Sequence, residues 1–208
     1  SAPMIADFDL DDDRDVLAPS IVFSSFIDTQ EGGVLRVLDG RTCIEQASLT
    51  GAGDRLVYAS NFAIGDLDRA ADGRPEIVAA SMIARATPGG LVAFGVDPAT
   101  RTFRRLWYGR RCDMAGEPRH TPNDWANNNG PSMHDLDDDG VPEVIFDRFV
   151  YDADGCLLNP SQTYTNYLRL GVFSVVTDVD ADGLPELVTH DGVYAWDTLD
   201  SVFRAAEA

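Results

Sequence analysis

The stretch DLDDDGVPE at 135–143, followed by the apolar VIF at 144–146, decides how the rest of the chain is interpreted. Its five acidic residues would repel one another in a folded protein unless a positive charge lay among them. The side chains at its first, third, fifth and ninth positions converge on one centre if the loop turns tightly, and the carbonyl oxygen of the seventh joins them. A set of oxygen ligands of this size suits Ca²⁺. Gly140 stands where the turn needs a positive φ, which glycine adopts at little cost.

The same pattern occurs three more times in the chain, and its recurrence is stronger support than any single copy. The copies read DFDLDDDRD at 7–15, DLDRAADGRPE at 66–76 and DVDADGLPE at 178–186. An apolar segment precedes and follows each copy. The copy at 66–76 has two extra residues between its second and third acidic positions, so we expect its site to bind weakly or not at all.

The acidity of the chain is concentrated in these loops. The 208 residues include 35 acidic and 16 basic residues, all of the latter Arg, for a formal charge of −19. Four acidic ligands in each of four copies account for 16 of the acids, which leaves 19 against 16 basic residues. The negative charge is therefore local, which argues against nucleic acid as a partner. No apolar run approaches the roughly 18 residues of a membrane span, so we expect no membrane insertion.

The three cysteines, Cys43, Cys112 and Cys156, lack the close paired spacing of a zinc site. They allow one disulfide and one free thiol, and the spacing leaves the pairing open. Calcium loops in structural modules work at about 10⁻⁴ to 10⁻³ M Ca²⁺, as found outside cells. We therefore expect an extracellular, cell-surface or periplasmic protein. The sequence shows no signal peptide, so the start at Ser1 is interpreted as a mature or trimmed end.

The residues around the loops favour β-strands over helices. An EF-hand needs a bidentate Glu at loop position twelve and flanking helices, but that position holds Phe146 in one copy and Thr189 in another. Pro142 and Pro185 lie inside the loops, and β-branched residues follow them, as in hairpins. A third predicted strand in each repeat ends in a turn, and a fourth follows. The predicted turns lie at 39–40, 97–98, 152–155 and 197, and the predicted fourth strands at 42–48, 102–107, 163–170 and 202–205.

Four antiparallel strands, repeated at intervals of 59, 69 and 43 residues, are typical of propeller blades. The four copies resemble FG-GAP/VCBS repeats, the calcium-loop blades of integrin alpha-subunit propellers. The resemblance implies an all-β fold, a β-propeller of four-stranded antiparallel blades, as one domain over 1–208. Its blades would span about 1–58, 59–108, 130–170 and 171–208, with an inserted connector at 109–129. The family usually closes about seven blades, so four imply a fragment, a ring completed by oligomerisation, or a compact four-bladed ring.

The resemblance also implies three to four Ca²⁺ ions, each in the loop between the first and second strands of a blade. The seventh loop position would contribute its backbone carbonyl. The implied ligands are Asp7, Asp9, Asp11, Asp13 and Asp15; Asp66, Asp68, Asp72, Arg74 and Glu76; Asp135, Asp137, Asp139, Val141 and Glu143; and Asp178, Asp180, Asp182, Leu184 and Glu186.

Length differences between the repeats fall on the face opposite the loops, if connections alternate between the two ends of the strands. The first two repeats carry extra residues around 24–32 and 81–89, and the connector to the third is the longest insertion. Six Arg between 101 and 119 and a Trp beside Asn residues suit an anionic or sugar ligand. Arg pairing with the acidic body, and Trp125 filling space between blades, are the structural alternatives. The candidate ligand residues are Arg110, Arg111, Arg119, His120, Trp125, Asn127 and Asn128.

These observations predict a binding or adhesion module that recognises a glycan or protein through the face opposite the calcium loops. The three His residues are scattered and no Ser or Cys lies in a nucleophile motif, so the sequence favours a binding protein over an enzyme. Two alternatives stay open. One is a part of a catalytic propeller such as a polysaccharide lyase, and the other is a structural spacer or ring-completing assembly fragment, as a homo-oligomer or with blades from a longer chain.

Overall fold

The protein is described by a computed structural model over residues 3–8, 19–28, 32–57, 61–67, 74–84, 87–121, 130–159, 174–189, 192–197 and 202–205. Within these residues the chain forms fifteen strands and one short 3₁₀ helix. The strands make four antiparallel sheets, three of four strands and one of three. The predicted all-β class and the fourfold repetition are thereby confirmed, and closure into a propeller ring stays a prediction.

Each sheet is built from strands that are consecutive in the chain. The first sheet holds β1 (Met4–Ala6), β2 (Ser20–Asp28), β3 (Gly32–Leu38) and β4 (Glu45–Leu49), and η1 (Ala52–Asp54) follows it. The second sheet holds β5 (Phe62–Gly65), β6 (Glu76–Ala84), β7 (Thr87–Asp97) and β8 (Thr102–Tyr108). The third holds β9 (Ser132–His134), β10 (Glu143–Phe146) and β11 (Phe149–Tyr151), and the fourth β12 (Val175–Thr177), β13 (Glu186–Thr189), β14 (Gly192–Asp197) and β15 (Val202–Ala205).

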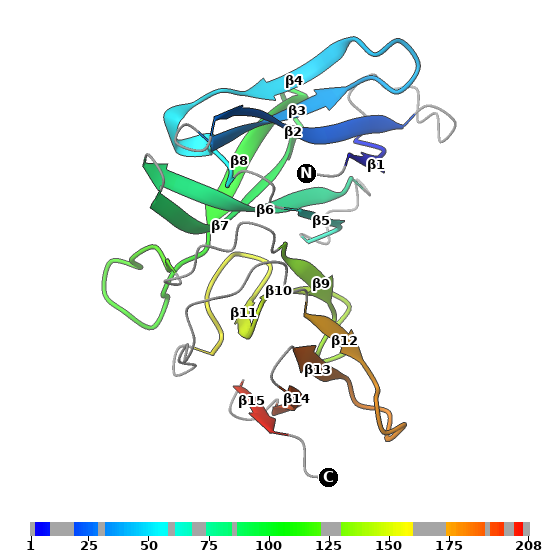
Figure 1. Cartoon of the computed structure of the whole chain (residues 1–208), viewed down its shortest axis with the longest axis vertical. Helices are drawn as coiled ribbons and strands as arrows, with labels where there is room; N and C mark the ends of the chain where they lie inside the picture. The colour runs from blue at the N-terminus through cyan, green and yellow to red at the C-terminus, as the bar shows by residue number, and fades with distance from the viewer. Residues whose placement is uncertain are drawn as a thin grey trace.

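The four sheets follow one another along an arc in chain order (Figure 1). The first strand of each sheet, β1, β5, β9 and β12, lies on the inner side of the arc, down the right of the view. The register places the acidic loop and the turn after the third strand at one end of a sheet, because Ala6 pairs with Ser20 and Ile21 with Leu38. We call this the loop end. The hairpin between the second and third strands lies at the other, the hairpin end.

The extra residues of the first two repeats lengthen strands. β2 and β3 have nine and seven residues and β6 and β7 have nine and eleven, against four and three in β10 and β11. The expected insertions around 24–32 and 81–89 are therefore mostly paired backbone, which corrects the loop prediction. These residues pair with each other within the β2–β3 and β6–β7 hairpins, and Leu56 lies between the two hairpins, bridging to Gly33 and Ser81. Gly33 N donates to Leu56 O at 2.8 Å, and Leu56 N to Gly33 O at 3.0 Å.

The connector, over its described part at 109–121, is not a separate loop, because it pairs with residues that follow β11. Arg110 forms bridges with Cys156 and Arg119, and its N–H donates to Gly155 O at 2.8 Å. A disulfide joins Cys112 to Cys156 across 44 residues, with their Cα atoms 5.5 Å apart. Tyr151, the last residue of β11, forms an isolated bridge with Leu157. The predicted fourth strand at 163–170 lies outside the described residues.

Three of the four predicted strand-three turns are held by an Asp side chain. Oδ1 of Asp39 accepts the N–H of Arg41 and Thr42, and Oδ1 of Asp97 accepts the N–H of Ala99 and Thr100. In the third repeat Oδ1 of Asp152 accepts the N–H groups of 154 and 156, at 3.0 and 2.8 Å. Such Asx turns are what a short acidic side chain stabilises. The turn at 197 lies at the edge of the described residues.

The third turn contains Gly155, which gives a direct test of its packing. Gly155 and Gly116 have φ of +82° and +80°, so an Ala at either position carries the same backbone strain of about 1 kcal/mol. A Cβ on Gly155 would lie 2.6 Å from Cε3 of Trp107, whereas nothing lies within 4 Å at Gly116. We expect Gly155→Ala to lower the free energy of unfolding by about 2 kcal/mol more than Gly116→Ala, because of this overlap. Urea unfolding measures both, and equal losses would contradict the packing of Trp107 on the turn.

The core consists of three apolar layers, one between each pair of consecutive sheets. Val22, Val37, Ile77 and Phe94 belong to the layer between the first and second sheets. The layer between the second and third sheets includes Val78, Ala93, Val144 and Tyr151. The smallest layer contains Leu136, Ile145, Val150 and Leu187, with Tyr194 and Trp196 packed against it. Each sheet is therefore held mainly by its neighbours in the chain.

Candidate metal centres

The acidic loop of the third sheet begins directly after β9 and turns around the side chain of Asp135. Oδ1 of Asp135 accepts the N–H of Asp139 at 3.1 Å, and Oδ2 accepts that of Gly140 at 2.8 Å. Oδ1 of Asp139 accepts the N–H of Val141 at 2.8 Å. The backbone has positive φ at Asp138 (57°) and Gly140 (84°), as the sequence predicts for the glycine. Asp is among the residues that adopt this left-handed region more readily.

The loop of the fourth sheet repeats this geometry contact by contact. Asp178 accepts the N–H of Asp182 at 3.1 Å and of Gly183 at 3.0 Å, and Asp182 accepts that of Leu184 at 2.8 Å. Positive φ values recur at Ala181 (62°) and Gly183 (92°). Two sequences that differ at several positions therefore adopt one conformation, because the shared Asp and Gly residues determine the turn.

A buried glutamate closes three of the four loops. Glu76, Glu143 and Glu186 are 4%, 8% and 4% exposed, and each begins the second strand of its sheet. The Oε2 atom of each accepts the N–H of the residue after the first loop Asp: Leu67 N to Glu76, Leu136 N to Glu143 and Val179 N to Glu186, all at 2.8 Å. The two-residue insertion in the second loop therefore leaves this contact unchanged. Sequence reasoning treated these residues as ligands and missed this bond.

Three carboxylates converge in each of the two complete loops. In one group Asp135, Asp137 and Glu143 each offer an oxygen within 4.8 Å of the others, and Asp178, Asp180 and Glu186 do so in the other. Each group can therefore hold a metal ion. Oxygen-only donors of this kind fit a hard divalent cation. Asp139 and Asp182, also predicted as ligands, direct Oδ1 at the backbone of the seventh loop residue.

The other two loops are described only in part. Asp7 follows β1 directly and Asp66 follows β5 directly, and both lie in the described residues. In each case the description breaks off one residue later. Arg74 and Glu76 end the second loop, and Glu76 takes the position that Glu143 and Glu186 take in theirs. The remaining predicted ligands, Asp9, Asp11, Asp13, Asp15, Asp68 and Asp72, lie outside the described residues. Those two sites stay predictions.

The carboxyl of Glu143 is held in an environment that disfavours its charge. Burial, together with the negative charges of Asp137 and Asp135, raises the pKa of Glu143 to about 7, against the hydrogen bond from the N–H of Leu136, which lowers it. A cation among these carboxylates would reverse the effect of the neighbouring charges. Proton and metal therefore compete for this group.

In metal-free protein we expect the stability to fall as the pH rises. The pKa of Glu143 is about 7 when folded and 4.5 as a free side chain, so its stabilisation is complete below about pH 4.5 and is lost as the pH rises through about 7. The loss is about 2 kcal/mol after allowance for solvent screening. Glu143→Gln should remove it, because Gln can still accept the Leu136 N–H but does not titrate. Urea unfolding in chelator at about pH 5 and about pH 8 tests this, and an unchanged pH difference in the variant would contradict it.

The two complete loops border one cleft of about 480 Å³. His134, Asp135 and Asp137 line it from the third sheet, and Val176 and Leu184 from the fourth. Leu184 is 62% exposed, so an apolar side chain stands beside acidic ones at the mouth of the cleft. Asp135 and Asp137 of one carboxylate group and Asp178 of the other therefore face the same cleft.

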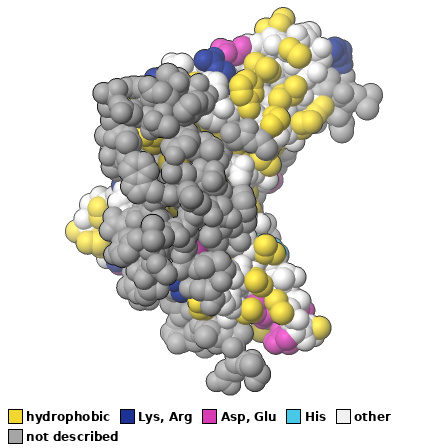
Figure 2. Space-filling model, in the orientation of Figure 1, with side chains coloured by type: hydrophobic (Ala, Val, Ile, Leu, Met, Phe, Trp, Pro, Cys, Tyr) yellow, Lys and Arg dark blue, Asp and Glu magenta, His cyan; other side chains and the backbone are white. Residues whose placement is uncertain are grey.

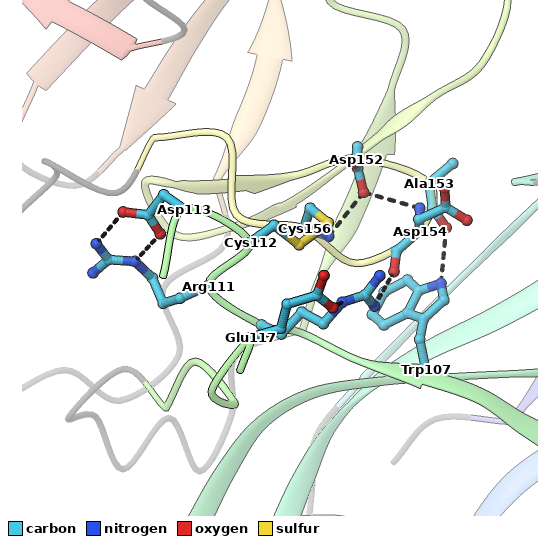
Figure 3. The surroundings of a disulfide bond; sticks show 10 residues. Trp107, Arg111, Cys112, Asp113, Glu117, Asp152, Ala153, Asp154 and Cys156 are labelled. Carbon is cyan, nitrogen blue, oxygen red and sulfur yellow. Dashed lines mark hydrogen bonds and ion pairs between the residues drawn. A yellow bond between two sulfur atoms is a disulfide. The ribbon is translucent and has the colours of Figure 1, made fainter. Parts of the chain in front are cut away.

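The predicted ligand residue Arg111 lies beside the disulfide (Figure 3), and Arg110 precedes it in the chain. Nε of Arg110 donates to Glu117 at 2.9 Å, and its Nη1 to Asp154 O at 2.6 Å. Arg111 makes two bonds to Asp113, at 2.7 and 2.6 Å. Both guanidinium groups thus pair with neighbouring protein groups. This is the alternative to ligand binding in which Arg residues pair with the acidic body of the protein.

Arg119 and His120 also contact the protein itself. The guanidinium of Arg119 lies 3.6 Å from the centre of the Tyr108 ring and bonds to Gly89 O and to Oγ of Ser81. Nδ1 of His120 lies 2.6 Å from the hydroxyl of Tyr151, and burial, with the charge of Arg111, lowers the pKa of His120 to about 4. Trp125, Asn127 and Asn128, the other predicted ligand residues, lie outside the described residues.

The fold and the site together define an all-β protein of four antiparallel sheets, two of which carry an acidic group suited to a metal ion. Among the described residues, no helix is long and apolar enough to cross a membrane. No protein-family model and no curated protein sequence matches the chain.

Solved structures do match the chain, although sequence comparison finds no relative. The chain is similar to the exotype rhamnogalacturonan lyase YesX, with a TM-score of 0.59 and 17% identity over 99% of this chain and 38% of the lyase. A Bacillus licheniformis rhamnogalacturonan lyase matches at a TM-score of 0.48 and 15% identity, over 98% of this chain and 45% of the lyase. The V. cholerae biofilm matrix protein Bap1 matches at a TM-score of 0.42 and 22% identity, over 91% of this chain and 34% of Bap1. At these identities the first likeness shows the fold, and the chain spans less than half the length of each of these proteins.

Proposed function

We propose that this chain is part of a calcium-stabilised β-propeller that acts on an acidic polysaccharide by lyase chemistry. The observation that carries the proposal is the likeness in fold, over 99% of the chain, to a rhamnogalacturonan lyase. It supports the catalytic alternative better than the binding or adhesion module that the sequence favours. The paired carboxylate groups supply the second support, because they suit Ca²⁺ and border a cleft of about 480 Å³, within the range of small-ligand sites.

Calcium would be held by Asp135, Asp137 and Glu143 in one loop and by the matching residues of the fourth sheet in the other. When bound, it supplies positive charge that offsets the repulsion between these acids and can attract a polysaccharide carboxylate. The loops themselves are held by Glu143 and Glu186, whose bonds to the loop backbone keep the carboxylates together. The chain's own contribution is therefore a rigid, acidic cleft that becomes usable to an anionic ligand only with its cations.

Lyase chemistry needs a base beside the sugar carboxylate. The base takes the proton from the carbon next to that carboxylate, and the electron pair forms a carbon–carbon double bond. The glycosidic carbon–oxygen bond on the next carbon breaks, and the leaving oxygen takes up a proton. His134 is the imidazole that lines the cleft, and a neutral imidazole nitrogen can accept a proton. We place the base there, whereas His120 is bound to Tyr151.

An extracellular setting belongs to the same proposal. A disulfide such as Cys112–Cys156 forms and persists in oxidising compartments. Extracellular Ca²⁺ also lies in the range that structural calcium modules require. The acidic polysaccharides that such a protein would meet are likewise outside the cell.

Incubation of the chain with rhamnogalacturonan, polygalacturonate and neutral dextran in Ca²⁺ tests the function. The expected result is ultraviolet absorbance of an unsaturated product from an acidic polymer, absent with dextran and in chelator. His134→Asn should abolish turnover while binding, measured by calorimetry, persists, and His120→Asn, at a half-buried residue outside the cleft, is the matched control on fold. Binding of acidic polymers without turnover by the wild type would support the binding module, and neither binding nor turnover would refute both.

A further inference from the structure

A second cleft, of about 460 Å³, opens between the fourth strands of the first and second sheets. We call it the rim cleft. Residues 46–49 of β4 line one side of it, and Arg101, Thr102 and Phe103, at the start of β8, line the other. None of these residues lines the cleft of His134 or belongs to the predicted ligand residues. The rim cleft is therefore a separate feature of the surface.

The rim cleft is open because the first sheet has a small residue where the second has a large one. Ala47 and Trp107 hold the same position, since each ends the cross-strand row that begins three residues before the first loop Asp of its sheet. Trp107 fills the space toward the third sheet, where its Nε1 donates to Ala153 O at 2.8 Å (Figure 3). The methyl group of Ala47 leaves the corresponding space toward the second sheet empty.

The turns that face these two residues correspond as well. Gly155 faces Trp107 so closely that a Cβ would lie 2.6 Å from the indole. Arg101 ends the matching turn of the second sheet, and both residues have a positive φ, of 82° and 54°. One contact between sheets thus pairs an indole with a glycine, and the other pairs a methyl group with an arginine. The space that a flat ring occupies in the first case is the rim cleft in the second.

The rim cleft has an apolar floor and a polar frame. Ala47, Leu49 and Phe103 form the floor, where they pack against the core layer between the two sheets. In the frame, Oε1 of Gln46 accepts the hydroxyl of Ser20 at 2.8 Å, which fixes the amide and leaves its NH₂ group to donate to a ligand. Sites for small molecules combine apolar lining with a few placed polar groups in this way, and the volume lies in their range.

The charge of the rim cleft is opposite to that of the chain. Arg101 is the one charged residue among the seven that line it. The neighbouring acids pair with other Arg residues, Glu45 with Arg36 at 2.5 Å and Asp97 with Arg104 at 3.1 Å. Elsewhere carboxylates gather, as at the loop between β12 and β13, at the lower right of Figure 2. In a chain of charge −19, a cleft with an arginine and no carboxylate favours an anionic ligand.

We propose that the rim cleft binds one unit of a sugar acid and so holds an acidic polysaccharide without reacting with it. The ring of the sugar would lie on the apolar floor, in the place that the indole takes at the next contact. Its carboxylate would lie at Arg101, and its hydroxyl groups would bond to Gln46 and Thr102. The ligand is of the class in the proposed function, but the site needs neither lyase chemistry nor a cation. Two contacts on one polymer bind more tightly than one.

Titration with digalacturonate in Ca²⁺, followed by the NMR shifts of backbone amides, tests the proposal. We expect shifts at 46–49 and 101–103, the residues of the rim cleft. Shifts at 134–138 and 176–178 report separately on the cleft of His134. The neutral disaccharide galactobiose should leave the rim residues unshifted at the same concentration, because it offers no carboxylate to Arg101.

Two substitutions alter the rim cleft in different ways. Arg101→Gln should raise the dissociation constant of digalacturonate at the rim by about tenfold, through loss of a charge-assisted bond. Arg104→Gln removes the same charge from an exposed residue of β8 outside the cleft, and as the matched control it should leave that constant unchanged. Ala47→Trp should abolish the rim shifts without lowering the melting temperature, because the indole would fill the cleft as Trp107 fills its own space.

The outcomes separate this site from the proposed catalytic one. Absence of rim shifts, equal binding of galactobiose, or wild-type affinity in both Arg101→Gln and Ala47→Trp would overturn the proposal. Rim shifts that persist in His134→Asn support it, because that substitution lies in the other cleft. A chain that binds digalacturonate at the rim but turns over no polymer would refute the lyase chemistry and leave the rim site in place.

Discussion

Removal of Ca²⁺ is expected to lower the free energy of unfolding by about 5 kcal/mol relative to protein in a hundredfold excess of Ca²⁺ over its dissociation constant. Each ion that binds only the folded state contributes about 2.7 kcal/mol at that excess, and the two complete loops offer two groups. The effect is large because the folded chain holds three carboxylates within 4.8 Å of one another in each group. Urea unfolding with Ca²⁺ and with chelator measures it.

A matched pair of substitutions assigns the effect to the loops. Asp137→Asn removes a member of a carboxylate group and should take away about half of the stabilisation by Ca²⁺, or about 2.7 kcal/mol. Asp138→Asn changes the charge of the same loop by the same amount at an exposed neighbour outside the group. Asn tolerates the positive φ of 57° at that position. If both variants respond to Ca²⁺ alike, general screening of negative charge explains the stabilisation better than bound ions.

Loss of the disulfide is expected to cost about 4 kcal/mol. Replacing both Cys112 and Cys156 by Ser opens a loop closed across 44 residues, and in the chain-entropy account this frees the unfolded chain by about that amount. The other described anchors of this segment are Arg110 and His120, which contact the third sheet and its following turn, and Arg119, which contacts the second sheet. We expect the amide protons of 109–121 to exchange faster in the variant, as well as a lower urea midpoint.

Cys43→Ser is the control for the disulfide, because Cys43 is an exposed free thiol. It should leave both the unfolding curve and the exchange rates unchanged. A double variant as stable as the wild type would show that backbone pairing alone, such as Leu157 N to Arg110 O, holds the connector. Loss of stability in Cys43→Ser would show that the thiol takes part in a contact beyond the single chain.

Local patterns predicted local structure well. The loops at 135–143 and 178–186 adopt the turn expected from their Asp and Gly positions, since every group that determines it lies within nine residues. The turns anchored by Asp39, Asp97 and Asp152 follow for the same reason. The contacts of the candidate ligand residues were harder to predict from the sequence. The partners of these Arg residues lie at varying distances along the chain, so no local pattern identifies them. Arg119, for example, contacts Tyr108 and Ser81.

The sequence by itself determined the all-β class, the fourfold repeat and the acidic loops, because strand periodicity and turn chemistry depend on neighbours in the chain. Only the tertiary structure decided that the extra residues of the first two repeats extend strands, because part of their backbone pairing comes from Leu56, in the linker between the two sheets. It also decided which two of the three cysteines pair, because folding brings the Cα atoms of Cys112 and Cys156 to 5.5 Å and leaves Cys43 as an exposed free thiol.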